Sequence, residues 1–266
     1  MSSKTKSKDE YSIQTVTNAV RVLLEFQGEE ELGVAELSRR LGLHKNNVFR
    51  LLATLELSGF IEQSPTERYR LGLASLELGH SFARSRDLMR RARPVLVDLS
   101  KRHEESAHLG TLQDFEIVHL DAEVPRRLLA ASSRVGLRLP VHCTALGKVL
   151  LGCAADSMRE AYDRDRVAGR PLPNETEATI VDPHKFFEHL RSVSVQGFAI
   201  DLEECERGLC CAAAPVFDES GAPVAALSIS GPSVRMSEER LLSEIAPSVT
   251  TAAEQLSREL GYAAVG

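Results

Sequence analysis

Residues 33–57 read GVAELSRRLGLHKNNVFRLLATLEL and contain two short helical patterns that meet at Gly42. Apolar residues recur at helical spacing in both patterns: Val34, Leu37 and Leu41 in the first, and Val48, Leu51, Leu52 and Leu55 in the second. Gly42 allows a sharp turn at little steric cost, and the small side chain of Ser38 lets the two helices approach each other. This spacing predicts a helix-turn-helix, whose second helix enters the major groove of DNA.

The outer face of the second helix carries the residues expected to contact DNA. Lys45, Asn46, Asn47 and Arg50 lie on its first two turns. Asparagine can pair bidentately with adenine and arginine with guanine, whereas lysine more often contacts phosphate. We therefore expect Asn46, Asn47 and Arg50 to recognise bases, and Lys45 to position the protein on the DNA backbone.

A short hairpin is predicted directly after this helix. Two strand-like runs, GFIEQ at 59–63 and RYRL at 68–71, enclose a turn that contains Pro65. Such a hairpin forms the wing of a winged helix, and we expect its Arg68 and Arg70 to contact DNA. A pair of amphipathic helices alone could belong to a protein-binding domain, but the attached wing favours DNA binding.

Composition places the chain among globular proteins with more than one domain. It has 266 residues, of which 43% are hydrophobic and 26% are charged, and it is long enough for two domains. No apolar run approaches the roughly 20 residues that a membrane-spanning helix needs. The first ten residues, MSSKTKSKDE, lack the apolar centre of a signal peptide. A cytoplasmic protein is therefore expected.

The net charge of −6 is unusual for a protein that binds DNA. Residues 1–75 carry ten basic and ten acidic side chains, so the acidic excess lies in the rest of the chain. DNA binding must then depend on local basic clusters. The lysines of the N-terminal tail could contribute, or the tail could be a disordered solubilising arm. The expected clusters are Lys4, Lys6 and Lys8 in the tail, and Lys45, Arg50, Arg68 and Arg70 on the helix and wing.

Periodicity divides the chain into segments. A first helix is predicted at 12–26, with Ser12 or Thr15 as its cap. A basic stretch predicts helices at 73–86 and 88–104, with a fresh helical segment starting at Pro94. The expected division is a disordered tail at 1–10, a winged helix-turn-helix domain at 11–72, a linker helix at 73–87 and a second domain at 88–262.

The second half changes to a β pattern interrupted by helices. Strands are predicted at 106–112, 115–122, 128–132, 198–202, 208–216 and 222–229, and helices at 155–163, 183–196 and 237–260. The first two strands should form a hairpin around Gln113 and Asp114. The pattern predicts an α+β domain, in which helices cover an antiparallel sheet.

Three segments of this domain could form a small-molecule site. The helix start at 143–147 offers free backbone N–H groups and the positive end of a helix dipole, which suit a carboxylate. Asp201 lies at the end of a predicted strand. Ser228 and Ser230 point to the same side of an apolar strand, beside Cys211 on its neighbour. The two hydroxyls could instead bond backbone at the sheet end, but apolar pockets with a few polar groups are typical ligand sites.

Catalysis is an alternative use of the same residues. His142, Cys143, Asp201 and Ser228 could form a nucleophile with a base, which would make the second domain an enzyme acting on a small organic acid. No nucleophile elbow or glycine-rich phosphate loop accompanies them. We therefore expect no catalytic residue, and we expect His142 to be a structural hydrogen-bonding residue beside the pocket.

The cysteines leave a second alternative open. All five lie in the second half, and their odd number argues against a disulfide framework. Their spacing fits no common zinc pattern, so neither a metal nor another cofactor is expected. A thiol-based redox regulator that uses Cys205, Cys210 and Cys211 would require exposed thiols with a low pKa.

The chain from about Tyr11 to Tyr262 resembles the IclR family of bacterial transcriptional regulators. The resemblance lies in GLHKNNVFRLLATLELSGFIE at 42–62, LPVHCTALGKVLL at 139–151 and GFAIDLEECERGLCCAAAPVFDESGAPVAALSISGP at 197–232. It implies a winged helix-turn-helix, a linker helix and a GAF-like effector-binding domain. It also implies homodimers or homotetramers on palindromic double-stranded promoter DNA, with a small organic acid as effector.

The resemblance also implies effector contacts at matching positions. These are the backbone amides of Ala145 and Leu146 for the carboxylate, Asp201 as an acidic contact, Leu209 and Cys211 in the pocket wall, and the hydroxyls of Ser228 and Ser230. Many members of the family have Pro and Ser-Thr where this chain has His44 and Asn46-Asn47, so a different operator is expected.

Overall fold

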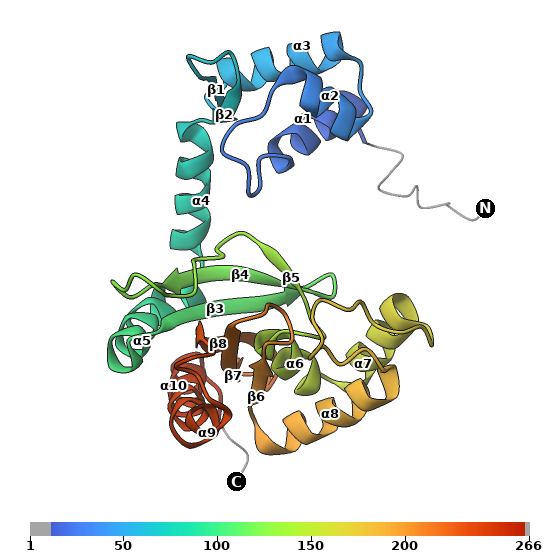
Figure 1. Cartoon of the computed structure of the whole chain (residues 1–266). Coiled ribbons are helices and arrows are strands. Elements are labelled where there is room, and N and C mark those ends of the chain that lie inside the picture. Colours follow the sequence, from blue (N-terminus) through green and yellow to red (C-terminus); the bar gives the residue numbers. More distant parts are fainter. Residues whose placement is uncertain (1–11, 264–266) are drawn as a thin grey trace, which may run out of the picture. The chain divides into compact units, whose positions relative to one another are not determined.

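The computed structural model describes residues 12–263, and the chain separates into two compact units. The first unit ends at Ser85 and the second begins at Arg86. The predicted tail at 1–10, with its three lysines, lies outside the described residues. Figure 1 labels the helices and strands of both units.

The first unit has the predicted winged helix-turn-helix fold. Its elements are α1 (Gln14–Leu24), α2 (Val34–Leu41), α3 (Lys45–Leu57), β1 (Ile61–Gln63), β2 (Tyr69–Leu71) and α4 (Leu73–Ser85). The two strands pair antiparallel, so the wing is present (Figure 1). Helix α4 occupies the span predicted for a linker helix. The predicted caps of the first helix are wrong, because Ile13 is the N-cap residue and makes no side-chain hydrogen bond.

The turn between α2 and α3 is held by the small residues noted in the sequence. Gly42 has a φ of 66°, in the left-handed region that glycine occupies at little cost. Ser38 donates a hydrogen bond from Oγ to the carbonyl oxygen of Leu43 over 2.6 Å. The apolar faces of both helices then meet in one core with Val22 and Tyr69. Burial of this shared face fixes the angle at which α3 presents its outer side.

The second unit is built around one antiparallel sheet. Its strands are β3 (Ser106–Gln113), β4 (Glu116–Glu123), β5 (Arg138–Pro140), β6 (Ala199–Leu202), β7 (Leu209–Phe217) and β8 (Pro223–Pro232). They lie in the order β5-β4-β3-β8-β7-β6. Its α-helices are α5 (Asp87–His103), α6 (Ala145–Gly152), α7 (Asp156–Tyr162), α8 (Pro183–Gln196), α9 (Glu238–Arg240) and α10 (Ala246–Glu259). The predicted α+β architecture is confirmed.

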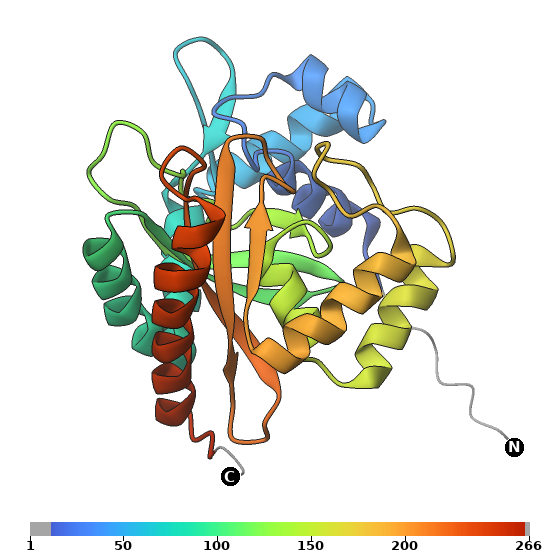
Figure 2. The same ribbon diagram turned by 60° about the horizontal axis from the view of Figure 1, so that its bottom comes forward.

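Helices cover both faces of this sheet (Figure 2). One core contains α5 and α10 residues such as Leu96 and Val249, packed with Leu227 of β8. The other contains α6 and α8 residues such as Val149 and Leu190, packed with alanines of β6, β7 and β8. Side chains alternate between the two faces along each strand. The small alanines let α6 lie close to the sheet.

Three local predictions differ from the structure. Residues 128–132 are not a strand; they belong to an irregular segment at 124–137, and the edge strand is β5. The β3–β4 turn lies at Asp114 and Phe115, whose φ values are 54° and 62°. Pro94 lies inside α5 and does not start a new helix.

Backbone carbonyl groups of the irregular segment accept hydrogen bonds from side chains and not from a neighbouring strand. Ser106 donates from Oγ to the carbonyl oxygen of Ala131 over 2.6 Å, and Arg235 donates to that of Leu129 over 2.9 Å. Such bonds occupy backbone groups that a sheet would otherwise pair. The predicted cap Ser237 is confirmed at the start of α9, where Oγ accepts from the N–H of Arg240.

Candidate functional site

The outer face of α3 is exposed at each of the four predicted positions. Val48 lies between them and is buried in the core of the first unit. None of the four side chains forms a hydrogen bond or ion pair with another residue among those that the structure describes. His44 is the N-cap residue, and its ring nitrogen Nδ1 accepts from the N–H of Asn46 over 3.4 Å. The four side chains, Lys45, Asn46, Asn47 and Arg50, are therefore available to an external partner.

The wing arginines have partners within the first unit. Arg68 lies 3.2 Å from a carboxylate oxygen of Glu36 and donates to the carbonyl oxygen of Glu31 over 2.8 Å. Arg70 lies 2.6 Å from a carboxylate oxygen of Glu62. These ion pairs are largely exposed and therefore weak. The wing carries less free positive charge than the sequence suggests, because each arginine already faces a carboxylate.

Strand pairing places polar residues of the second unit in two rows on one face of the sheet. Asp201, Cys211, Ser230 and Ser106 are partners across β6, β7, β8 and β3. In the next row, two residues away, Ala213, Ser228 and His108 are partners across β7, β8 and β3. Residues two apart along a strand point to the same side. The register therefore brings a carboxyl, hydroxyls, a thiol and an imidazole to one surface.

The N-terminus of α6 faces this surface. Thr144 is the N-cap residue: its Oγ1 accepts from the N–H of Gly147 over 3.2 Å and donates to the carbonyl oxygen of Pro140 over 2.7 Å. The first N–H groups of a helix have no partner within it. Thr144 satisfies one of them, and those of Ala145 and Leu146 remain to bind an anion at the positive end of the helix dipole.

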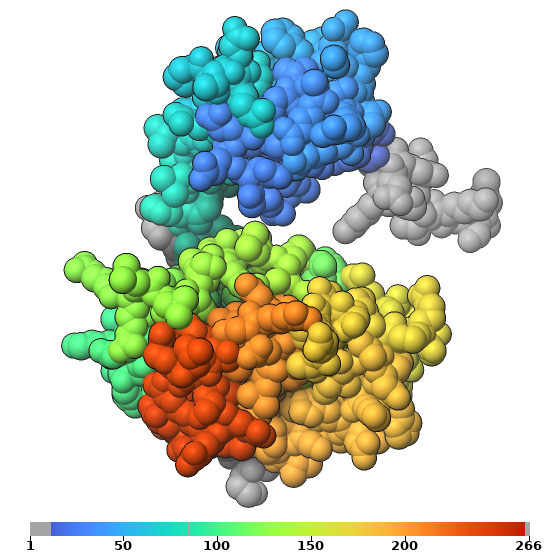
Figure 3. All heavy atoms as spheres, in the orientation of Figure 1, coloured from blue at the N-terminus to red at the C-terminus, as the bar shows by residue number. Residues whose placement is uncertain are grey.

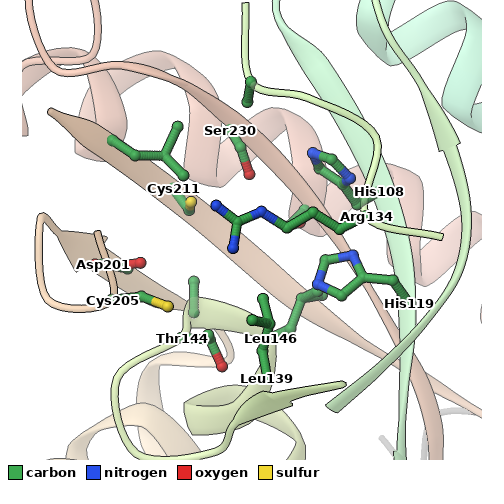
Figure 4. Close-up of a pocket in the computed structure, with 14 residues that line it drawn as sticks. His108, His119, Arg134, Leu139, Thr144, Leu146, Asp201, Cys205, Cys211 and Ser230 are labelled. Carbon is green, nitrogen blue, oxygen red and sulfur yellow. The ribbon is translucent and has the colours of Figure 1, made fainter. Parts of the chain in front are cut away.

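A narrow cavity of about 30 Å³ lies between the sheet and α6 (Figure 4). All seven positions predicted for effector contacts line it: Ala145, Leu146, Asp201, Leu209, Cys211, Ser228 and Ser230. It is also lined by seven residues that were not predicted as effector contacts: His108, His119, Ala131, Arg134, Leu139, Thr144 and Cys205. The structure brings the predicted residues together, and their role in binding stays a prediction.

The carboxyl group of Asp201 is almost completely buried. Burial, together with the neighbouring Glu204, raises the pKa of Asp201 to about 7, although the ammonium of Lys148 opposes this shift. Asp201 accepts a hydrogen bond from the N–H of Glu204 over 2.7 Å. Lys148 and Glu204 form a buried ion pair beside it. Asp201 can thus act either as a donor or as an acceptor near neutral pH.

The residues considered for catalysis do not share the cavity. Asp201 and Ser228 line it, whereas His142 and Cys143 are not among its lining residues. The Nε2 atom of His142 lies 2.9 Å from the carbonyl oxygen of Pro173, which confirms its structural hydrogen bond. Among residues 12–263, no three His, Cys, Asp or Glu side chains are grouped as metal ligands.

Both units match a family of known regulators. The IclR helix-turn-helix domain matches residues 15–65, and the C-terminal domain of the bacterial transcriptional regulator IclR matches residues 80–258. The chain belongs to the IclR family of bacterial transcriptional regulators. The resemblance found in the sequence is thereby confirmed, and the chain is a DNA-binding transcriptional regulator.

Individual relatives agree with this assignment. The HTH-type transcriptional regulator KdgR of Escherichia coli strain K12 is 37% identical over 256 residues, which cover 94% of each chain. The crystal structure of Thermotoga maritima IclR is 29% identical, with a TM-score of 0.76 over 94% of this chain and 100% of that one. An IclR homologue from Microbacterium hydrocarbonoxydans, complexed with 4-hydroxybenzoate, is 25% identical, with a TM-score of 0.78 over 92% and 98% of the two chains.

No helix within residues 12–263 is both long enough and apolar enough to span a bilayer.

Proposed function

We propose that the cavity of this IclR-family regulator binds a small organic acid, and that the acid controls operator binding. The observation that carries the proposal is the convergence of two free N–H groups of α6, two serine hydroxyls and Asp201 on one buried cavity. The complex of a relative with 4-hydroxybenzoate supports a small organic acid as the ligand. The carboxylate of the acid binds the N–H groups of Ala145 and Leu146.

The DNA partner is bound through α3. Asn46, Asn47 and Arg50 contact base edges, and Lys45 with the wing arginines contacts phosphate. A homodimer, or a tetramer built from two, presents two such helices to the half-sites of a palindromic promoter in the cytoplasm. The acid binds one arrangement of the protein more tightly than the other, so acid and DNA affect each other's affinity by the same factor.

The direct test combines a gel shift with calorimetry. The full chain is mixed with DNA from its own promoter region, with and without candidate acids, and acid binding is measured separately. Ser228→Ala combined with Ser230→Ala should weaken acid binding and leave the DNA affinity of the acid-free protein unchanged. An unaltered acid affinity in the double variant would remove these residues from the site. Conversion of an acid into a product would favour the enzyme alternative.

The thiol alternative is favoured by one cysteine of the three. Cys205 lines the cavity, and a hydrogen bond with Cys143 lowers the pKa of its thiol. Burial raises the pKa of Cys210 to about 11 and also raises that of Cys211 well above its ordinary value, so these two thiols are poor nucleophiles. A Cys205→Ser variant that still responds to acid but has lost a response to peroxide would support redox control by Cys205.

A further inference from the structure

The cavity has a second polar side formed by two histidines. His108 and His119 come from neighbouring strands, and their rings meet edge to face with centroids 5.4 Å apart. Their exposed fractions are only 2% and 5%. None of the described residues provides a hydrogen-bond partner for Nδ1 of His108 or for either ring nitrogen of His119. Buried polar atoms normally have a partner, so these nitrogens are able to bond a molecule that enters the cavity.

Both imidazoles are neutral at physiological pH. Burial, the neighbouring imidazole and Arg134 lower the pKa of His108 to about 3. Burial and the Arg134 guanidinium lower the pKa of His119 to about 4. A neutral imidazole offers one N–H donor and one acceptor nitrogen. This combination matches a hydroxyl group, which both donates and accepts, better than it matches a carboxylate.

Arg134 brings a cation to the same part of the cavity. It lies in the irregular segment 124–137, which projects from the surface of the second unit (light green in Figure 3). Its side chain extends into the cavity past both histidines (Figure 4). Glu206, on the turn between β6 and β7, holds the guanidinium by an ion pair. The exposed fraction of the side chain is 19% for Arg134 and 57% for Glu206.

The Arg134–Glu206 pair is easily exchanged for another anion. A carboxylate as exposed as that of Glu206 is well solvated, so losing its partner costs little. A carboxylate inside the cavity would face Arg134 with less competition from water, and charge-assisted hydrogen bonds are strongest there. Exchange of partners would also release the link between segment 124–137 and the β6–β7 turn.

We propose that Arg134, His108 and His119 determine which acids the regulator accepts, by selecting carboxylates that carry an additional hydroxyl group. Arg134 leaves Glu206 and adds a side-chain contact to the carboxylate held at the α6 N-terminus. The two histidines bind the hydroxyl group. This inference rests on the proposed binding of an organic acid in the same cavity, and it adds the chemical class of that acid.

Matched pairs of acids test the selection. The probes are 4-hydroxybenzoate with benzoate and 4-hydroxybutyrate with butyrate, each titrated into the full chain by calorimetry. In at least one pair the hydroxylated acid should bind tighter by at least about tenfold, because a site built to bond a hydroxyl rejects the analogue that lacks it. Equal affinities within both pairs would overturn the inference while leaving the proposed function intact. If none of the four acids binds, both proposals fail.

Substitutions assign the selection to these residues. His119→Phe replaces the imidazole with an aromatic ring that has no nitrogens, so the preference within a pair should fall to about twofold while the plain acid still binds. Arg134→Gln should weaken both acids of a pair by about tenfold or more, and Arg134→Lys should restore part of the loss. Arg138→Gln is the matched control, because Arg138 lies just after the same segment but outside the cavity.

A separate experiment tests whether Arg134 leaves Glu206 to bind the carboxylate of the acid. Glu206→Gln removes the competing carboxylate, so acids should bind about two- to fivefold tighter, opposite to the effect of Arg134→Gln. Hydrogen exchange in segment 124–137, measured by mass spectrometry without any acid, should rise in the Glu206 variant. Unchanged exchange together with unchanged or weaker acid binding would overturn the role of this ion pair. Each variant is first compared with the parent in thermal unfolding.

Discussion

The two polar surfaces of this regulator are built in opposite ways. The outer face of α3, which we propose contacts DNA, exposes four polar side chains, which come from six consecutive residues, 45–50. The cavity buries its polar groups, which come from β3, β4, β6, β7, β8, α6 and the segment 124–137. Water can solvate every group of the first surface until DNA replaces it. In the second, each group without a partner costs stability.

This contrast predicts where substitutions act. A change on α3 should alter affinity for DNA and leave folding unchanged, because exposed side chains contribute little to stability. A change at the cavity should alter stability and acid binding together, because its polar groups are held away from water. The following experiments are arranged from the largest expected effect to the smallest.

Asp201→Asn should stabilise the protein at alkaline pH. The pKa of Asp201 is about 7 in the folded chain, above the ordinary value of 3.8, mainly because of burial. The parent therefore loses stability as pH rises from about 4 to about 7, while asparagine does not titrate. Denaturant titrations should show the variant more stable at pH 8 by up to roughly 4 kcal/mol, with the difference vanishing near pH 4.

Asp218→Asn is the opposite control for that experiment. Hydrogen bonds from Ser220 lower the pKa of Asp218, which is partly exposed. Its charged form stabilises the fold above the ordinary carboxyl pKa, and this contribution disappears as pH falls through the lowered value. The variant should therefore be slightly less stable than the parent at pH 8. If both aspartate variants changed stability in the same direction, burial would not be the cause of the Asp201 effect.

Gly147→Ala should damage the α6 side of the cavity. An added Cβ would lie 2.2 Å from the carbonyl oxygen and 2.5 Å from the Cα atom of Val141, which are backbone atoms that cannot move aside alone. We expect a loss of about 3 kcal/mol in the free energy of unfolding. Gly79→Ala on α4 is the control, since an added Cβ there meets no atom within 4 Å. Equal stability of the Gly147 variant and the parent would show that the helix start can shift freely.

Sequence periodicity was sufficient for the first unit because its information is local. The apolar spacing of α2 and α3 and the left-handed Gly42 lie within one short stretch, and a slip of one residue would bury Lys45 or expose Leu52. The wing followed from two short runs around one proline. What the pattern did not show is that Arg68 already faces Glu36 on α2, and that Arg70 faces Glu62, its partner across the two strands of the wing.

From the sequence, the residues that line the cavity could be predicted only where they lie within the motifs shared with the family. The seven predicted positions lie within 139–151 and 197–232. His108 and His119 lie outside these motifs, and they face the cavity because of the β3–β8 register and a bulge between Leu109 and Gly110. Arg134 lies just after the run 128–132, which was predicted as a strand but belongs to an irregular segment, and such segments follow no periodicity. Register and loop path are long-range properties, so these three residues were not found.

Arg50→Ala should weaken specific binding to the operator by about 1–3 kcal/mol if the guanidinium contacts a base. Arg50 is exposed and forms no ion pair with any described residue, so its loss should not alter thermal unfolding. The measurement compares affinity for promoter DNA with affinity for random DNA at one salt concentration. An unchanged ratio of the two affinities would assign Arg50 to the DNA backbone.

Lys45→Ala should give the smallest effect, and it should differ from the Arg50 effect in kind. A phosphate contact contributes by releasing a bound counterion, so its loss weakens specific and random binding alike. The slope of log affinity against log salt should fall by about one. Arg70→Ala is the matched comparison. Because Arg70 already neutralises Glu62 at 2.6 Å, removing it leaves an unpaired carboxylate near the DNA.

The salt dependence of DNA affinity in the Lys45→Ala and Arg70→Ala variants then distinguishes an unpaired basic residue from one that is already paired with a carboxylate. If Arg70 contacts phosphate only after leaving Glu62, the double variant Arg70→Ala with Glu62→Ala should bind DNA better than Arg70→Ala alone. Lys45 needs no such double variant, since no described carboxylate forms an ion pair with Lys45. An unchanged salt slope in the Lys45 variant would mean that this lysine stays in water when α3 binds, and that the base-contacting residues alone hold the helix in the groove.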